Sequence, residues 1–408
     1  MQKIIGPFIQ LLDMSGLPLK GAIKSDQLKI IQHAAVVVEE GIIVATGKFT
    51  DLAHQFPKAV LEEMEGDYVL LPGFVDCHTH LCWDGSRAND YAARLDGKTY
   101  LEIAEAGGGI WSTVTHTRQS TATELIKKTV QRANHHLKNG VTTIEVKSGY
   151  GLSVEEEIKI LQAIKAADQT TKADLIPTCL AAHMKPKDFN GSNIEYLEML
   201  VNELLPRIKD EKLTNRIDIF IERSAFSKEE ALYYLQSAKL LGFDITVHGD
   251  QFSVGGSEVA VQVNALSVDH LEASGEKEIQ MVAASDTIAV ALPGASIGLG
   301  MAFTPARKIL DKGGALAIGS DWNPGSAPMG DLLTQACILG AYEKLSIAET
   351  LAGLTTRAAA ALKLNSIGSI EKCKLADFQA YPVDDYRAIF YHQGSIKPSK
   401  VWKRGVEV

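Results

Sequence analysis

The chain has 408 residues, 46% of them hydrophobic and 22% charged, a composition typical of a soluble globular protein with one or two domains. Its formal net charge of −9, with no compensating basic run, argues against nucleic acid or an anionic membrane as a partner. The five cysteines are scattered and form no CxxC pair, which predicts a reduced protein and excludes a disulfide scaffold. Since we find neither a basic leader nor an apolar run approaching the roughly 18 residues of a membrane span, the sequence predicts a cytoplasmic protein.

Both ends of the chain have the pattern of short β-strands. β-branched runs at 29–31, 34–38 and 41–45 are separated by turn-forming residues, and Glu39-Glu40-Gly41 is typical of a hairpin turn. Runs at 376–380 and 401–403 repeat the pattern after about residue 366. We therefore expect residues 1–71 and 366–408 to meet in one small β-sandwich subdomain.

Residues 72–365 alternate between apolar strands and helical stretches. We expect strands at 74–81, 142–146, 174–182, 217–222, 244–248, 265–271, 288–293 and 316–321, with helices at 122–139, 154–168, 194–211, 228–242, 257–264 and 276–284 between them. Eight strands with helical crossovers, spanning about 250 residues, indicate a (β/α)8 TIM-type barrel as the catalytic domain.

The alternative fold is an open, doubly wound parallel sheet. That fold predicts a glycine-rich phosphate turn after the first strand, where this chain has His78-Thr79-His80. The Gly107–Gly109 run comes later and lacks GxGxxG or Walker spacing, so a tight turn or hinge at the rim of the site is the better interpretation.

Two histidines, His78 and His80, end the first predicted barrel strand. Because side chains alternate along a strand, both point to the same face, together with Asp76. Paired imidazoles suit a transition metal, and Asp76 could orient one ring from behind. With 11 histidines in the chain, coincidence is the alternative for this pair alone.

The other predicted strands also end in polar side chains. These strand-end residues are Glu145 to Gly151, His183, Glu222, His248 to Gln251, Asp269 with His270, and Ser320 to Asn323. In a barrel the carboxyl ends of all strands meet on one face, where active sites lie. Since buried His and Asp are costly without partners or function, their convergence predicts a metal-dependent site.

Several segments carry a resemblance to a known family. The chain resembles the amidohydrolase superfamily in the segment Pro72 to His80, in His248 and His270, and in Ser320-Asp321. It resembles a mononuclear subtype of that superfamily, since the predicted strand 217–222 has no lysine that could bridge two metals. Within it, the chain resembles the imidazolonepropionase family, which catalyses the third step of histidine degradation. The segments that carry this closer resemblance are Gly85-Ser86-Arg87, Ala106 to Val114, Glu145 to Leu152, His183 and Asp321 to Ser326.

The resemblance implies a set of site residues. It implies one zinc or iron(III) ion per subunit, with His78, His80, His248 and Asp321 as ligands, and spacing cannot choose between the two metals. It implies substrate contacts from Arg87, Tyr150, His183, Gln251 and Ser326, product contacts from Asn323 and Gly325, and Tyr100 beside the substrate carboxylate. A homodimer is usual for the family.

The implied reaction is the hydrolytic ring opening of 4-imidazolone-5-propanoate to N-formimidoyl-L-glutamate. It needs an activated water, a polarised carbonyl and a proton for the leaving nitrogen. We assign proton transfer from water to Asp321, place His270 and Gln251 at the reacting group, and give Arg87 the propionate carboxylate, which its planar guanidinium suits. The alternatives are that Arg87 is a surface residue, Tyr150 only packs, and His183 only caps its strand.

Two other function classes fit parts of the pattern. A mononuclear ring deaminase of the cytosine or guanine type would use the same four ligands, but it carries a glutamate three residues after the His248 position, where this chain has Gln251. An amide cannot relay a proton, so the sequence argues against deamination. Many members of the resembling family also carry Glu there, which leaves the role of Gln251 open. A non-catalytic barrel would usually have lost metal ligands, and all four are present here.

Overall fold

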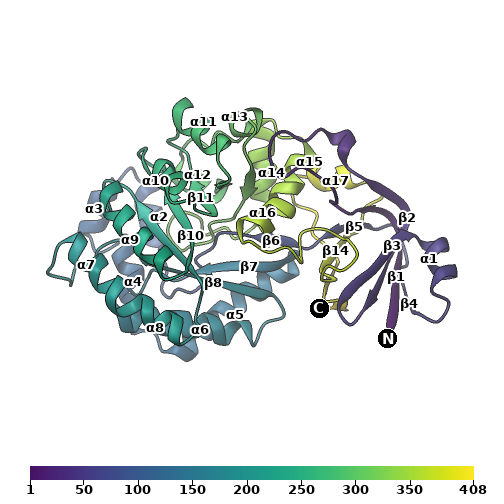
Figure 1. Ribbon diagram of the computed structural model, residues 1–408, viewed down its shortest axis with the longest axis horizontal. Helices are drawn as coiled ribbons and strands as arrows, with labels where there is room; N and C mark the ends of the chain where they lie inside the picture. The colour runs from purple at the N-terminus through teal and green to yellow at the C-terminus, as the bar shows by residue number, and fades with distance from the viewer.

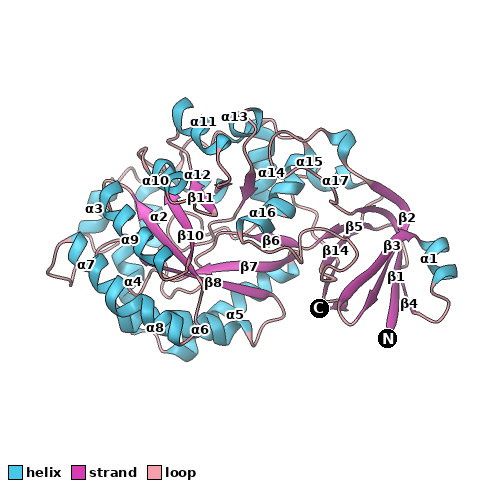
Figure 2. Cartoon of the chain, viewed as in Figure 1, coloured by secondary structure: helices cyan, strands magenta, loops and turns pink.

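Eight parallel strands of the middle segment pair with one another in chain order. The computed structural model describes residues 1–408 except for the side chains of Tyr100, Leu101 and Ala104. The order of the strands in the sheet runs from β6 to β13 (Figures 1 and 2). The strands are β6 (Phe74–Asp76), β7 (Val141–Lys147), β8 (Asp174–Ala182), β9 (Arg216–Ile221), β10 (Asp244–Gly249), β11 (Ser267–His270), β12 (Ile288–Ala291) and β13 (Leu316–Ile318). A parallel bridge between Thr79 and Trp322 joins the segments that follow β6 and β13. The predicted (β/α)8 barrel is confirmed, because each predicted strand overlaps one of these eight.

The first and last barrel strands are shorter than we predicted. β6 ends at Asp76 and β13 at Ile318, whereas the sequence pattern extended them to residues 81 and 321. The Asp76 side chain accepts hydrogen bonds from the backbone N–H groups of His78 and Ser320, at 3.4 Å and 2.9 Å, in place of ladder bonds. Asp321 has a φ of 52°, a left-handed conformation that no strand can include. The residues of the site therefore lie in turns just beyond the strands.

Helices cover the outside of the barrel. They are α5 (Ala122–Lys138), α6 (Val154–Asp168), α7 (Asn193–Met199), α8 (Leu205–Asp210), α9 (Lys228–Leu240), α10 (Gly256–Gln262), α11 (Glu276–Ala284), α12 (Pro293–Leu299), α13 (Ala306–Asp311), α14 (Leu332–Glu343), α15 (Ile347–Leu354) and α16 (Thr356–Ala361). Capping boxes at Thr121, Ser192, Ser227 and Ser346 mark four of their starts.

One predicted helix, at 194–211, is divided into three parts. A π-helical segment, Leu200–Leu204, separates α7 from α8, and Pro206 lies at the start of α8. Because proline has no N–H, the α-helical ladder is interrupted there.

The two ends of the chain share one mixed sheet beside the barrel. Its strands are β1 (Gln2–Leu12), β2 (Ile30–Glu39), β3 (Ile42–Lys48), β4 (Val60–Glu63), β5 (Val69–Pro72), β14 (Phe378–Tyr381), β15 (Lys400–Lys403) and β16 (Val406–Glu407). Figure 1 shows both termini at this sheet, and β14 pairs with β5, so the predicted meeting of the two ends is confirmed. Phe8 of β1 and Trp402 of β15 contact each other although two strands separate them in the ladder, so the sheet curls around its own core. The exact boundaries at 71, 72, 365 and 366 stay a prediction.

The predicted hairpin turn at Glu39-Glu40-Gly41 is confirmed. β2 and β3 are antiparallel, and Glu40 and Gly41 have φ values of 51° and 80° between them. Two consecutive residues with positive φ fit the tight hairpin turn that matches strand twist. The remaining helices of the terminal segments are η1 (Ser25–Gln27), α1 (Phe49–Gln55) and α17 (Tyr386–Tyr391).

Three helices form an insert between β6 and β7. They are α2 (Ala88–Leu95), α3 (Tyr100–Glu105) and α4 (Ile110–Gln119). The Gly107–Gly109 run makes the turn between α3 and α4, with φ values of 89° at Gly107 and 75° at Gly109. The Gly109 N–H donates to Asp90 of α2 at 2.8 Å, which ties this turn to the rim of the site. None of the described helices is long and apolar enough to cross a membrane.

Candidate metal centre and active site

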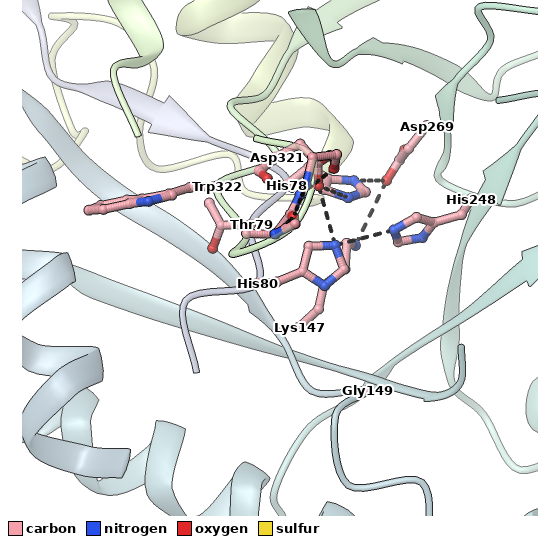
Figure 3. Close-up of polar contacts among 12 residues, drawn as sticks. His78, Thr79, His80, Lys147, Gly149, His248, Asp269, Asp321 and Trp322 are labelled. Carbon is pink, nitrogen blue, oxygen red and sulfur yellow. Dashed lines mark hydrogen bonds and ion pairs between the residues drawn. The ribbon is translucent and has the colours of Figure 1, made fainter. Parts of the chain in front are cut away.

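Four side chains from distant parts of the sequence meet at the carboxyl end of the barrel. Nitrogen atoms of His78, His80 and His248 all lie within 4.8 Å of one another, and all three residues are buried (Figure 3). Asp321 Oδ1 lies 3.5 Å from His78 Nε2 and 3.3 Å from His80 Nε2, while His80 Nε2 and His248 Nε2 are 3.4 Å apart. The arrangement brings together the complete predicted ligand set.

These distances fit a metal ion. A tetrahedral ion with ligands at roughly 2.1 Å places neighbouring ligand atoms about 3.4 Å apart. The measured separations of 3.3 to 3.5 Å match that spacing. In addition, His78 Nε2 is buried and has no hydrogen-bond partner among the described residues, a costly arrangement that a metal would relieve. The donor set of imidazoles and one carboxylate therefore suits a transition metal.

The three imidazoles are held in the neutral form that a metal requires. Burial lowers the pKa of His80 and of His248 to about 3 each. Burial, followed by the positive charge of Lys147, also holds the pKa of His78 well below its usual range. Neutral rings present a free lone pair at physiological pH, so protons do not compete for the site.

Carboxylates behind the rings orient two of them. Asp269 Oδ2 is 2.6 Å from His78 Nδ1, and Asp218 Oδ2 is 2.9 Å from His248 Nδ1. The first is a hydrogen bond and the second an ion-pair contact, and each places a carboxylate oxygen beside Nδ1, on the side of the ring away from Nε2. We expected Asp76 in this role, and that prediction is wrong: Asp76 Oδ2 lies 3.1 Å from His136 Nε2 instead, because the Asp76 carboxylate faces α5 and the backbone of Ser320.

His270 lies beside the cluster at the end of β11. Its ring centroid is 5.9 Å from that of His78 and 5.4 Å from that of His248. Burial lowers the pKa of His270, but the nearby carboxylate of Glu272, 3.4 Å from Nδ1, more than offsets this and leaves the pKa above its ordinary value. His270 can therefore donate a proton or a hydrogen bond near neutral pH.

A cavity of about 820 Å³ opens over these side chains. Of the predicted site residues, it is lined by His80, Arg87, Tyr150, His183, His248, Gln251, His270, Asp321, Asn323, Gly325 and Ser326. His78 lies behind this lining, where it is fully buried. The side chain of Tyr100 lies outside the described residues. The structure thus gathers the predicted residues around one space large enough for a small metabolite.

Arg87 is a half-buried residue at the start of α2. Its Nε donates to Asp90 three residues further on, and the residue lines the cavity. A Cβ on Gly325 would lie 3.0 Å from Arg87 Nη1, so glycine at this position leaves room for the guanidinium. Arg87 therefore lines the cavity, and its contact with the substrate stays a prediction.

Tyr150 and His183 form an aromatic wall next to His80. The His183 ring stacks on the His80 ring at a centroid distance of 5.6 Å, and Tyr150 lies 5.9 Å from His80. His183 Nδ1 contacts the Gly149 carbonyl at 3.0 Å, and this contact fixes the orientation of the ring. Both side chains line the cavity in addition to packing.

Buried carboxylates hold the loops that carry this wall and Gln251. Glu157 accepts hydrogen bonds from the N–H groups of Gly149, Gly151 and Leu152, at 2.7 to 3.0 Å, and so fixes the Tyr150 turn. Glu222 accepts from the N–H groups of Phe252 and Ser253 in the loop after Gln251. Glu222, which we noted as a strand end, therefore anchors a loop of the site.

The turn from Asp321 to Ser326 is organised by Asn323. Its amide donates to the Asp321 carbonyl at 2.7 Å, and its Oδ1 accepts from the N–H groups of Gly325 and Ser326, at 2.8 Å each. The Ser326 hydroxyl is 3.4 Å from Asp321 Oδ2. The turn thus places the candidate ligand Asp321 and the predicted Ser326 contact next to each other.

Sequence reasoning missed several cavity residues. They are Asp90, Arg94, Ile103, Ile110, Phe220, Arg223, Ser224, Phe252, Ser253, Val254, Ala273, Leu299 and Met301. Most lie on the insert or on loops after the strands, whose positions depend on tertiary packing rather than on period or spacing. Only Arg94, seven residues after Arg87 on the same helix, gave a usable signal, since i and i+7 share a helix face.

Comparison with known proteins identifies the family to which the chain belongs. Residues 69–408 match the family model described as "Amidohydrolase family". An imidazolonepropionase of Bdellovibrio bacteriovorus is 40% identical over 98% of this chain and 94% of its own length, and one of Thermoanaerobacter pseudethanolicus is 37% identical over 90% and 88%. The chain therefore belongs to the amidohydrolase family and, within it, to the imidazolonepropionases.

Solved structures share the fold at low sequence identity. A zinc- and atraton-bound variant of atrazine chlorohydrolase from Arthrobacter aurescens TC1 superposes with a TM-score of 0.71 at 15% identity, covering 99% of this chain and 94% of that one. Guanine deaminase from C. acetobutylicum, with bound guanine, superposes with a TM-score of 0.68 at 17% identity and covers all of both chains. At this identity the likeness shows the fold alone.

The low pKa of His80 predicts how the metal-free protein responds to acid. In the unfolded chain His80 takes up a proton below about pH 6.5, whereas in the folded chain it does so only near pH 3. Protonation therefore favours unfolding between these values. From pH 7.5 to pH 5, the metal-free protein should lose about 2 kcal/mol of unfolding free energy relative to the His80→Gln variant. Urea titrations of both proteins, with metal removed, measure this difference. A difference that does not change with pH would mean that the folded protein protonates His80 freely.

Proposed function

We propose that this chain hydrolyses 4-imidazolone-5-propanoate to N-formimidoyl-L-glutamate, the third step of histidine degradation. One observation carries the proposal: a single cavity is lined both by the metal-binding side chains His80, His248 and Asp321 and by the guanidinium of Arg87. The substrate has the two matching features, a cyclic amide C–N bond and a propionate tail. The relatives named imidazolonepropionase, at 35 to 40% identity over nearly the whole chain, support the same reaction.

We assign the metal site to one zinc or iron(III) ion per chain, held by His78, His80, His248 and Asp321. When bound, such an ion supplies Lewis-acid chemistry and lowers the pKa of a water molecule from about 15.7 to about 7. Three imidazoles and one carboxylate suit either metal, so analysis of the purified protein decides between them.

The chain's own residues handle the protons of the reaction. The Asp321 carboxylate, whose pKa burial raises above its ordinary value, takes the proton from the attacking water. The water oxygen bonds to the ring carbonyl carbon, the C–N bond breaks, and the proton taken from the water is returned to the leaving ring nitrogen. His270, with Glu272 behind it, polarises the carbonyl, and Gln251 orients the ring by hydrogen bonds, since an amide can donate and accept but cannot transfer a proton.

The remaining cavity residues are assigned to parts of the substrate and of the product. Arg87 binds the propionate carboxylate through its guanidinium group, with Tyr150 and Tyr100 beside it. His183 and Ser326 contact the substrate ring. Asn323 and Gly325, in the turn after Asp321, contact the product. A homodimer in the cytoplasm is the assembly that we propose by likeness to the family.

The direct test is incubation of the metal-loaded protein with 4-imidazolone-5-propanoate, with the product identified by mass spectrometry. We expect stoichiometric formation of N-formimidoyl-L-glutamate, and loss of both turnover and metal in the His78→Ala variant. Ammonia release from guanine or cytosine, without ring opening of imidazolone-propanoate, would contradict the proposal and favour a deaminase.

Arg87→Ala tests the assignment of the carboxylate. A charge-assisted hydrogen bond contributes about 1.5 to 3 kcal/mol, so the variant should bind imidazolone-propanoate about 10- to 100-fold more weakly. An analogue that lacks the carboxylate should bind both proteins equally. Arg223→Ala, which removes an exposed arginine at the rim of the same cavity, is the matched control and should change either affinity little. If Arg87→Ala lost the same affinity for the substrate and for the analogue, the assignment of the carboxylate to Arg87 would be wrong.

A further inference from the structure

Lys147, at the end of β7, is a fully buried lysine that the proposed reaction does not use. Its Nζ donates to Glu145 Oε1 at 2.7 Å and lies 2.8 Å from Asp218 Oδ2 and 3.8 Å from Asp269 Oδ2. The side chain is 1% exposed. Burial alone would lower the pKa of Lys147. The three carboxylates raise it by more than burial lowers it, so the pKa lies above its ordinary value and the amine stays charged. A buried charge is costly, and this one persists only because of its partners.

Two of the carboxylates that contact Lys147 also contact metal-binding histidines. The oxygen of Asp218 that faces Lys147, Oδ2, is the same atom that lies 2.9 Å from His248 Nδ1. Likewise Asp269 Oδ2, on the Lys147 side, lies 2.6 Å from His78 Nδ1. Figure 3 shows Lys147 and Asp269 close to the rings of His78, His80 and His248. A single ammonium group is therefore shared by the two carboxylates that orient two ligand rings from different strands.

Removal of this charge would disturb both rings together. Without the ammonium, Glu145, Asp218 and Asp269 would be three buried carboxylates in a dry region. They would then move apart or take up protons, since like charges cannot stay ionised side by side there. Either change alters the Asp218 and Asp269 oxygens that hold His248 and His78 in the orientation with Nε2 toward the site.

We propose that Lys147 is a positioning residue that sets the orientation of His78 and His248 together, through the shared oxygens of Asp269 and Asp218. The inference rests on the metal assignment of the proposed function but not on the substrate. It predicts that Lys147 controls metal affinity and ligand geometry, whereas a lysine that only neutralises buried charge would affect folding stability alone.

The test compares Lys147→Met with a matched control, Lys403→Met. Methionine keeps the length of the side chain and removes the charge. Lys403, on β15 of the terminal sheet, is also a buried lysine, 3% exposed, and pairs with Asp174 at the start of β8 and with Asp377 just before β14, at 2.7 Å and 2.5 Å. Each metal-free protein is titrated with Co²⁺, and the affinity and visible absorption spectrum of the Co²⁺ form are recorded with no substrate present.

We expect Lys147→Met to bind Co²⁺ about 10- to 100-fold more weakly and to change the absorption bands. Lys403→Met should lose stability but keep wild-type affinity and spectrum. Wild-type affinity and spectrum in Lys147→Met would overturn the proposal. Because the readout needs no substrate, a wild-type protein that binds Co²⁺ but does not open the imidazolone ring would refute the proposed reaction and leave this inference intact.

A second variant covers the case in which Lys147→Met does not fold. Lys147→Met combined with Glu145→Gln removes one of the three carboxylates, and Glu145 is the one that touches neither ligand ring. The double variant should fold and show the same weakened Co²⁺ binding. Failure of both variants to fold would also contradict the proposal, because Lys147 would then be required by the barrel rather than by the metal site.

Discussion

The closure of the barrel between its first and last strands is the constraint on which the site depends. The Asp321 N–H donates to the His78 carbonyl, and the His80 N–H donates to the Trp322 carbonyl, each at 3.0 Å. These two bonds join segments some 240 positions apart and fix the backbones of three of the four candidate ligands relative to one another. The left-handed conformation of Asp321 then turns its carboxylate toward His78 and His80, a strained geometry that the closure maintains.

Around this closure, buried carboxylates orient side chains and loops of the site that hydrophobic packing alone would not orient. Asp218 and Asp269 direct imidazoles, Glu157 fixes the Tyr150 turn, and Glu222 fixes the loop after Gln251. Hydrophobic burial has no direction, whereas hydrogen bonds and ion pairs do. The carboxyl end of the barrel is therefore rich in buried polar side chains whose partners are fixed, which is what a preorganised site requires.

The sequence predicted the elements whose signals are local or periodic. The strand 174–182 and the helix 154–168 are found at those positions, because apolar period, caps and turn residues specify them. The meeting of the four candidate metal ligands was also predictable, since a resemblance in short motifs placed them at strand ends. The ends of β6 and β13 were not, because there the Asp76 side chain replaces the strand ladder.

Contacts between side chains on different barrel strands could not be predicted from the sequence. Asp76 shares a face with His78 on a strand, and this favoured it as the orienting carboxylate, yet Asp269 takes that place from 191 residues away. Lys147 lies within a motif that carried the resemblance, but its position between Asp218 and Asp269 depends on how β7, β9 and β11 pack together. Arg94 and the other rim residues depend on the fold of the insert in the same way.

Titration of the metal-free protein with zinc or iron, with turnover of imidazolone-propanoate recorded at each addition, tests the central claim most directly. The account predicts activity that rises linearly and stops at one ion per chain, because His78, His80, His248 and Asp321 form one mononuclear site. Full turnover in the absence of metal, or a plateau only at two ions per chain, would contradict it.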